Sequence, residues 1–202
     1  MNRIATFVLL ACLLPGALQP ADAADAIRRF VLVAGANDGG TDRPALKFAM
    51  TDAGRFVDVM EKLGGVEPGD TTILRQPKGG EIEAALESLR TLIVAVRRQA
   101  TGVPTRTELF FYYSGHADEQ GLLIGHDRLS YMTLRERIEA IPADVRIAVL
   151  DACASGAITR IKGGKLKSPF TVDASSNMRG QAFLTSSSAT EAAQESERIG
   201  GS

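Results

Sequence analysis

The residues of this chain best suited to chemistry are a histidine and a cysteine that each follow an apolar run. His116 comes shortly after residues 109–113, and Cys153 comes shortly after residues 146–150. The whole chain of 202 residues contains only two cysteines and two histidines. A cysteine thiolate is a nucleophile, and a nearby imidazole can take the thiol proton and later protonate a leaving amine. The pair therefore predicts nucleophilic catalysis, provided that the fold brings the two side chains together.

The other cysteine and histidine indicate no further chemistry. Cys12 lies in an apolar N-terminal segment, and His126 follows a turn, where we expect an exposed histidine without a catalytic role. The four positions lack the ligand spacing of a zinc site, and two cysteines cannot build a disulfide scaffold. We therefore predict neither a metal site nor a cofactor. For Cys153 alone, the alternative is a small buried hydrophobic side chain, but its pairing with His116 favours catalysis.

The apolar pattern predicts an α/β domain with a mostly parallel sheet, because strand-like runs alternate with helical stretches. The runs that are typical of strands cover residues 29–34, 71–74, 109–113, 122–124, 146–150 and 182–185. Apolar residues at three- and four-residue steps predict helices over residues 44–63, 81–98 and 134–141. We expect the aromatic residues of the third run to pack in the core.

This architecture explains how His116 and Cys153 could meet. In an open parallel sheet, functional groups gather just beyond the carboxyl ends of the strands. If the strands at residues 109–113 and 146–150 are parallel neighbours, the two side chains leave the sheet at the same edge. The sequence therefore predicts an active site at this edge.

Residues 1–23 have the pattern of a secretory signal peptide. Arg3 provides a positive start, residues 4–14 are apolar, and Ala21 and Ala23 are small residues in the −3 and −1 positions of a cleavage site. The apolar run is shorter than the roughly 20 residues that span a bilayer. We therefore predict cleavage after Ala23 and no stable membrane span.

The composition and the leader limit the partners of the remaining domain, residues 24–202. The formal net charge is −1, from 23 basic and 24 acidic residues, which does not favour nucleic-acid binding. A lipobox-like sequence before Cys12 offers lipid anchoring as an alternative to cleavage. We favour cleavage, which predicts an exported protein in the periplasm or outside the cell.

Five segments of the chain resemble the caspase-like cysteine peptidases, and most closely the bacterial caspase and metacaspase group. The segments are RFVLVAGAND, ALKFAMTDAGRF, LFFYYSGHAD, RIAVLDACASG and AFLTSSSATEAAQES, which together extend over most of residues 29–202. The resemblance implies a three-layer sandwich in which helices flank a mostly parallel sheet. The family continues beyond the last segment, so the resemblance also implies that the chain lacks the C-terminal strand and helix.

The same resemblance implies a cysteine-type endopeptidase. His116 and Cys153 would form a dyad that cleaves peptide bonds through a thioester. The backbone N–H groups of Cys153 and Ala117 would form the oxyanion hole, although the family usually has glycine in place of Ala117. The alternative is a catalytically silent caspase-fold module with a regulatory or interaction role.

Three residues match metacaspase positions that line a pocket for an arginine or lysine side chain: Asp52, Ser114 and Asp151. Two carboxylates are physically suited to a cationic side chain. The resemblance therefore implies peptide or protein substrates that are cut after Arg or Lys. For Asp52, the alternative is an ordinary charge on a helix surface.

Regulation is less defined by the sequence. The basic stretch at residues 160–167 lies where family members have a cleavable linker, so self-cleavage within residues 160–181 is a hypothesis. The alternative is a solvated basic loop. The resemblance leaves calcium activation open, and its metacaspase character favours a monomer.

Overall fold

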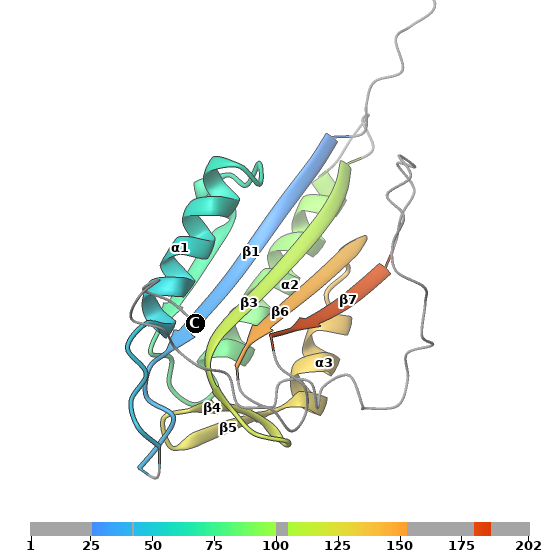
Figure 1. The fold of residues 1–202 in the computed structure, drawn as a ribbon. Coiled ribbons are helices and arrows are strands. Elements are labelled where there is room, and N and C mark those ends of the chain that lie inside the picture. The colour runs from blue at the N-terminus through green and yellow to red at the C-terminus, as the bar shows by residue number, and fades with distance from the viewer. Residues whose placement is uncertain (1–25, 42, 100–104, 153–179, 187–202) are drawn as a thin grey trace, which may run out of the picture.

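The centre of the molecule is a parallel sheet with the strand order β2–β1–β3–β6–β7 (Figure 1). The structure is a computed structural model that describes residues 26–41, 43–99, 105–152 and 180–186. The parallel strands are β1 (Ala26–Ala36), β2 (Thr71–Arg75), β3 (Thr105–Ala117), β6 (Val145–Asp151) and β7 (Gly180–Thr185). Each of them contains one of the strand-like runs seen in the sequence.

A short antiparallel extension continues from the carboxyl end of β3. Strand β4 (Gly121–Ile124) pairs with the last two residues of β3, and β5 (Asp127–Ser130) pairs with β4. The sequence pattern predicted an extended segment at residues 122–124 but missed β5. This strand has only four residues, of which Leu129 alone is fully buried, so it is too short to show an alternating pattern.

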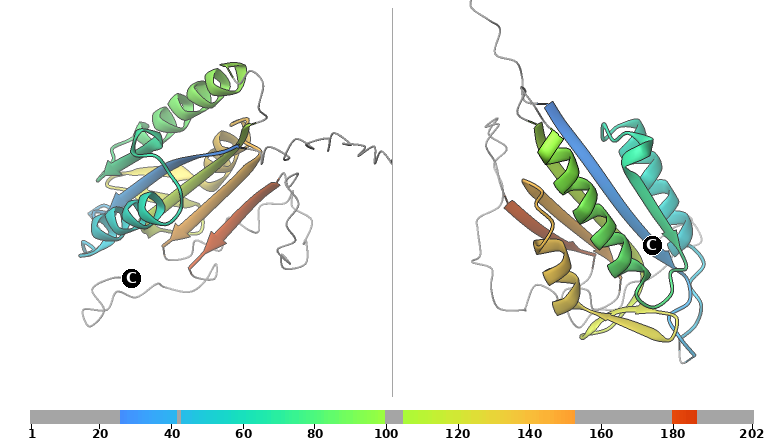
Figure 2. Two further views of the ribbon diagram at one scale, coloured as in Figure 1. Left: turned by 90° about the horizontal axis from the view of Figure 1, so that it is seen from above. Right: turned by 180° about the vertical axis from the view of Figure 1, so that it is seen from behind.

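Helices cover both faces of the sheet (Figure 2). Helix α1 (Ala49–Lys62) packs on one face, while α2 (Glu81–Gln99) and α3 (Tyr131–Glu139) pack on the other. A 3₁₀ turn, η1 (Pro68–Asp70), leads into β2. The predicted α/β sandwich, with a mostly parallel sheet between helices, is confirmed.

The helix predicted at residues 44–63 is shorter than its apolar pattern indicated, because α1 begins only at Ala49. The preceding loop is bound to the end of β1 instead. The backbone oxygen of Asn37 accepts from Leu46 N at 2.8 Å, and its side-chain Oδ1 accepts from Met50 N at 3.0 Å. Asn37 thus satisfies an N–H of the first helical turn. A cap supplied from so far upstream leaves no signal in the local sequence.

Helix α3 begins earlier than predicted, at Tyr131 instead of residue 134. The reason is the side chain of Ser130, whose Oγ accepts from Thr133 N at 3.0 Å and caps the helix. The helix also ends at Glu139, before the predicted end at residue 141.

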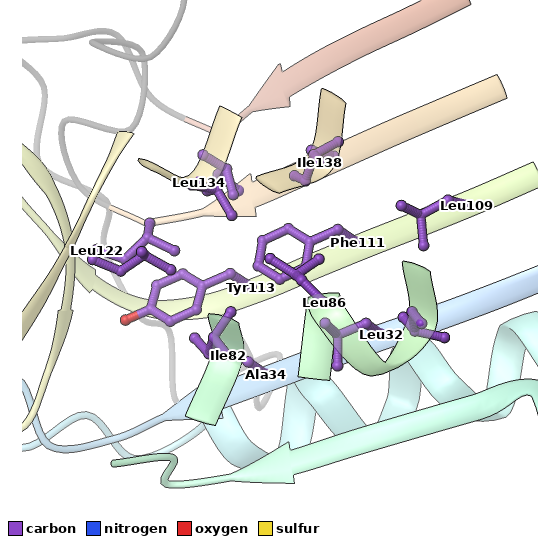
Figure 3. Close-up of a cluster of buried hydrophobic side chains, with 14 of the residues drawn as sticks. Leu32, Ala34, Ile82, Leu86, Leu109, Phe111, Tyr113, Leu122, Leu134 and Ile138 are labelled. Atoms are coloured by element: carbon purple, nitrogen blue, oxygen red, sulfur yellow. The ribbon is translucent and has the colours of Figure 1, made fainter. Parts of the chain in front are cut away.

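Strand β3 connects the two cores of the molecule. Leu109, Phe111 and Tyr113 face α2 and α3 in the larger core, whereas Phe110 and Tyr112 face α1 in a smaller one. Figure 3 shows the larger core, in which these three residues lie among Leu32, Ala34, Ile82, Leu86, Leu122, Leu134 and Ile138. Burying one such large side chain stabilises the fold by roughly 1.5–3 kcal/mol. The strand that carries His116 is therefore firmly held.

Several sequence predictions concern residues outside the described ranges. They are the signal peptide at residues 1–23, the nucleophile Cys153, self-cleavage within residues 160–181, and the missing C-terminal elements. These remain predictions. Among the residues that the structure does describe, none belongs to a helix that is both long and apolar enough to cross a membrane.

Candidate active site

The predicted site residues on β3 and β6 lie near the carboxyl ends of these strands. The two strands end at the same edge of the parallel sheet (Figure 1). Strands β3 and β6 are parallel neighbours, which is the condition on which the predicted site depends, and Ser114 is paired with Asp151 in their register. His116 lies two residues beyond Ser114. Cys153 lies two residues beyond Asp151 in the chain, outside the described residues.

The imidazole of His116 is held from the side of the β1–α1 loop. Its Nε2 lies 2.9 Å from the backbone oxygen of Pro44, and only 7% of the residue is exposed. A carbonyl oxygen can only accept, so Nε2 carries the proton of this hydrogen bond. In the neutral ring, Nδ1 then has the lone pair and can act as a base. The loop thus fixes the tautomer of the histidine.

A glycine in the same loop allows its backbone to lie against the ring. A Cβ atom placed on Gly39 would lie only 2.3 Å from Cδ2 of His116. Any larger residue would push either the loop or the imidazole out of place. Gly39 and the carbonyl of Pro44 therefore confine the histidine together.

The backbone around His116 is fixed by a tyrosine from the larger core. The hydroxyl of Tyr113 donates a shared hydrogen bond to the backbone oxygens of His116 and Leu123, at 2.9 and 2.8 Å. Burial raises the pKa of Tyr113 far above its ordinary value, so the phenol stays neutral and remains a donor. Its ring packs in the core, as the sequence predicted, while its hydroxyl joins β3 to β4.

The backbone N–H of Ala117, a predicted member of the oxyanion hole, lies at the start of the antiparallel extension. Asp118 N donates to Gly121 O at 3.0 Å, and the next pair along the ladder is Ala117 with Leu122. Hydrogen-bonded and non-hydrogen-bonded pairs alternate in an antiparallel ladder. The N–H of Ala117 therefore points away from β4.

The three predicted pocket residues lie near one phenol, that of Tyr112. The Tyr112 hydroxyl donates to Oδ2 of Asp151 at 3.3 Å, and the side chain of Ser114 is close enough to lower the pKa of this phenol. Asp52 lies in the first turn of α1, with a side chain that is 12% exposed and 3.4 Å from Arg55. Asp52 is therefore mostly buried, unlike an ordinary helix-surface charge.

The surroundings of Tyr112 raise the pKa of its phenol. Burial raises this pKa first, and the charge on Asp151 raises it further. The charge on Asp52 adds to the increase. Both carboxylates therefore act on the same hydroxyl, and the site combines two negative charges with neutral donors. Such a group can bind a cationic side chain.

The sequence analysis missed two contributors to this arrangement. Tyr112 was expected only to pack in the core, yet its hydroxyl contacts Asp151. The two-residue period of a strand could have revealed this role, because residues 112 and 114 share one face of β3. Pro44 gave no signal, since it acts through its backbone oxygen.

A third missed residue, Ser186, follows directly after β7. Its Oγ accepts from Ala152 N at 3.1 Å, and its own N–H donates to Leu150 O at 3.1 Å. Ser186 thus binds the chain on both sides of Asp151. A serine inside a serine-rich stretch has no pattern that would distinguish it in the sequence.

His126 is the second histidine of the chain. It is exposed at the turn between β4 and β5, where it lines a shallow pocket of about 330 Å³ with Arg43, Asp127 and Arg128. Among the residues that the structure describes, no three or more His, Cys, Asp or Glu side chains are grouped to hold a metal ion. Neither observation assigns His126 a role in the site.

Comparison with protein families gives one match. A family described as the caspase domain matches residues 28–202, which is most of the chain. The matched residues include His116, Cys153 and the three predicted pocket residues. A search of curated proteins finds no match.

Proposed function

This chain belongs to the caspase domain family of peptidases, and from that membership we propose that it is a cysteine endopeptidase with His116 and Cys153 as its catalytic dyad. The observation that carries the proposal is the state of His116. Its Nε2–H is bound to the Pro44 carbonyl, which leaves Nδ1 as the base that a thiol requires.

The connectivity of the chain supports the pairing. Cys153 follows Asp151 by two residues, a length of chain that spans at most about 7 Å. His116 follows Ser114 by two residues, and Ser114 is the register partner of Asp151. The two residues thus lie at equivalent positions beyond the paired part of neighbouring strands, where groups of a catalytic pair can face each other.

The first half of the proposed reaction forms a thioester. Nδ1 of His116 takes the thiol proton, and the sulfur of Cys153 attacks the carbonyl carbon of the scissile bond. The resulting oxyanion accepts hydrogen bonds from the N–H groups of Cys153 and Ala117. When the intermediate collapses, the C–N bond breaks and the imidazolium gives its proton to the leaving amine.

The second half restores the enzyme. His116 takes a proton from water, and the water oxygen attacks the thioester carbon. The C–S bond then breaks, the peptide leaves as a carboxylic acid, and the thiol regains its proton from the imidazolium. No cofactor takes part in these steps.

We further propose that the enzyme cuts after Arg or Lys. Asp52 and Asp151 would bind the cationic group of the substrate residue, and the Ser114 hydroxyl would line the pocket. Charge-assisted hydrogen bonds to a carboxylate are about twice as strong as neutral ones. A substrate with an acidic residue at this position would instead be repelled. The proposed substrates are therefore peptides and proteins with a basic residue at the cleavage site.

The signal-peptide pattern adds a proposed location. Removal of residues 1–23 during export would give a periplasmic or extracellular enzyme with a single cysteine, Cys153. With no second cysteine in the chain, this thiol could not be lost to an internal disulfide in an oxidising compartment.

The test is covalent labelling of the full chain by peptidyl electrophiles that carry either Arg or Asp at the cleavage position, with and without calcium. We expect labelling by the Arg reagent only. Cys153→Ser should abolish the labelling, and His116→Ala should reduce kcat/KM by about 10²–10⁴-fold. The matched changes Cys12→Ser and His126→Ala should leave both readouts unchanged.

Two outcomes would contradict the proposal. Labelling by the Asp reagent instead would overturn the roles of Asp52 and Asp151. If neither reagent labels the protein, with or without calcium, the catalytically silent module becomes the better interpretation.

A further inference from the structure

We infer that Tyr112 is a positioning residue that sets the specificity of this site: its hydroxyl orients the Asp151 carboxylate and thereby favours arginine over lysine at the cleavage position. The inference rests on the proposed function and adds a residue and a preference to it. It follows from the placement of one phenol on the α1 face of β3.

The ring of Tyr112 is fixed before any substrate binds. It stacks on Phe56 of α1 with a centroid distance of 4.4 Å and an angle of 9° between the planes. Only 7% of the residue is exposed. A ring held between a sheet and a helix has little freedom, so its hydroxyl stays at a defined point.

That point lies beside the acids of the pocket. The hydroxyl donates to Oδ2 of Asp151 at 3.3 Å. Burial and the two neighbouring acids raise the pKa of Tyr112 far above its ordinary value. The phenol therefore remains protonated and acts as a donor at every pH at which the enzyme would work.

A donor on one oxygen restrains rotation of the Asp151 carboxylate. This restraint matters differently to the two basic side chains. The guanidinium of arginine is a planar fork that forms two parallel hydrogen bonds only with a correctly oriented carboxylate. The ammonium of lysine is a compact charge with rotatable donors and tolerates many orientations. Loss of the hydroxyl should therefore weaken arginine recognition more than lysine recognition.

The neighbouring tyrosine shows that this role is not general to the aromatic segment. Tyr113 lies on the opposite face of β3, and its hydroxyl donates to backbone oxygens of His116 and Leu123. These hydrogen bonds join the backbone of β3 to that of β4. Tyr112 instead contacts a carboxylate side chain at the carboxyl edge.

The experiment compares the full-length wild type with Tyr112→Phe, which keeps the ring and removes only the oxygen. The substrates are two peptides that differ only in Arg or Lys at the cleavage position. We expect kcat/KM to fall about five- to tenfold for the Arg peptide, the equivalent of one hydrogen bond, and by less than about twofold for the Lys peptide. Tyr131→Phe removes a phenol oxygen from the core on the opposite face and should leave the Arg/Lys ratio unchanged.

A change of equal size for both peptides, or none, would overturn the inference while the proposed function stands. If the wild type cleaves neither peptide, the proposed function fails and the inference with it. Melting curves check that Tyr112→Phe is folded. Should it not be, Phe56→Leu weakens the stack without touching the pocket and should lower the Arg/Lys ratio in the same direction by a smaller factor.

Discussion

The acids of the proposed pocket, at the carboxyl edge of the parallel sheet, are held differently from three acids at its amino edge. At the amino edge, three acids bind arginines from other parts of the fold: Arg28–Asp70 at 2.7 Å, Arg29–Glu108 at 2.9 Å and Arg97–Asp144 at 2.9 Å. At the carboxyl edge, Asp151 accepts from the neutral phenol of Tyr112. Asp52 pairs within its own helix with Arg55, which is 58% exposed.

This difference separates stability from function. An arginine from another element neutralises an acid and joins two parts of the chain. A phenol orients a carboxylate without cancelling its charge, and a mostly exposed arginine neutralises its partner only weakly. The amino edge therefore stabilises the fold, whereas the acids of the proposed pocket would serve to bind the cationic group of a substrate.

The largest effect that tests this contrast is on substrate binding at the carboxyl edge. Asp151→Asn keeps the shape of the side chain and an acceptor for Tyr112 but removes the charge. We expect kcat/KM for a peptide with Arg at the cleavage position to fall about 10–100-fold, because a hydrogen bond to a charged group is worth about 1.5–3 kcal/mol. The measurement is steady-state cleavage of a fluorogenic peptide, with a melting curve to show that the fold is unchanged.

Asp144→Asn is the matched control, since it makes the same chemical change at the opposite edge. It should alter kcat/KM by less than about twofold, since a charge this far from the site is screened by solvent. Equal losses of activity in the two variants would contradict the division of roles between the edges.

The next largest predicted effect is on the free energy of unfolding, to which Asp144 contributes. Burial by itself would raise the pKa of this carboxyl, but hydrogen bonds from the N–H and hydroxyl of Thr107 and the charge of Arg97 lower it overall. A lowered pKa means that the ionised form favours the folded state. At pH 7, we expect Asp144→Asn to lose about 2 kcal/mol of unfolding free energy, the scale of hydrogen bonds to a charged group.

The stabilisation by Asp144 should depend on pH, and the lowered pKa determines the direction of this dependence. The stabilisation is complete above the ordinary aspartate pKa of about 4 and is lost as the pH falls through the lower pKa of the folded state. Denaturant unfolding of wild type and Asp144→Asn should therefore differ most near neutral pH and converge as the pH falls below about 4. A gap that stays constant from pH 7 to pH 3 would show that the ionised carboxylate is not the source.

The sequence predicted the parts of this contrast that depend on periodic burial. The apolar runs located the parallel strands, and the predicted site required β3 and β6 to be parallel neighbours, which the structure shows. The sequence could not predict groups that act through the backbone or across long separations. Pro44 binds His116 through a carbonyl, and Asn37 caps α1 from the end of β1. For Tyr112, the sequence predicted that the ring packs in the core, but it did not predict the hydrogen bond of the hydroxyl.

The smallest predicted effect concerns how the carboxyl edge is held in place. Ser186 accepts from Ala152 N and donates to Leu150 O, so it restrains the segment that leads directly to Cys153. Ser186→Ala removes one acceptor, a loss of about 1 kcal/mol. We expect kcat to fall about fivefold, with KM nearly unchanged, because the substrate pocket keeps its charges. Ser186→Thr retains the hydroxyl and should recover most of the rate.

The matched control is Ser88→Ala. Ser88 also makes a side-chain hydrogen bond to the backbone, to Ala84 O, but on the exposed surface of α2. It should leave kcat unchanged. If Ser186→Ala raises KM instead of lowering kcat, Ser186 acts on the pocket and not on the nucleophile segment. The hydrogen bonds of Ser186 would then position the charged pocket alone. The two edges of the sheet would differ in the charge that they carry but not in how their backbone is held.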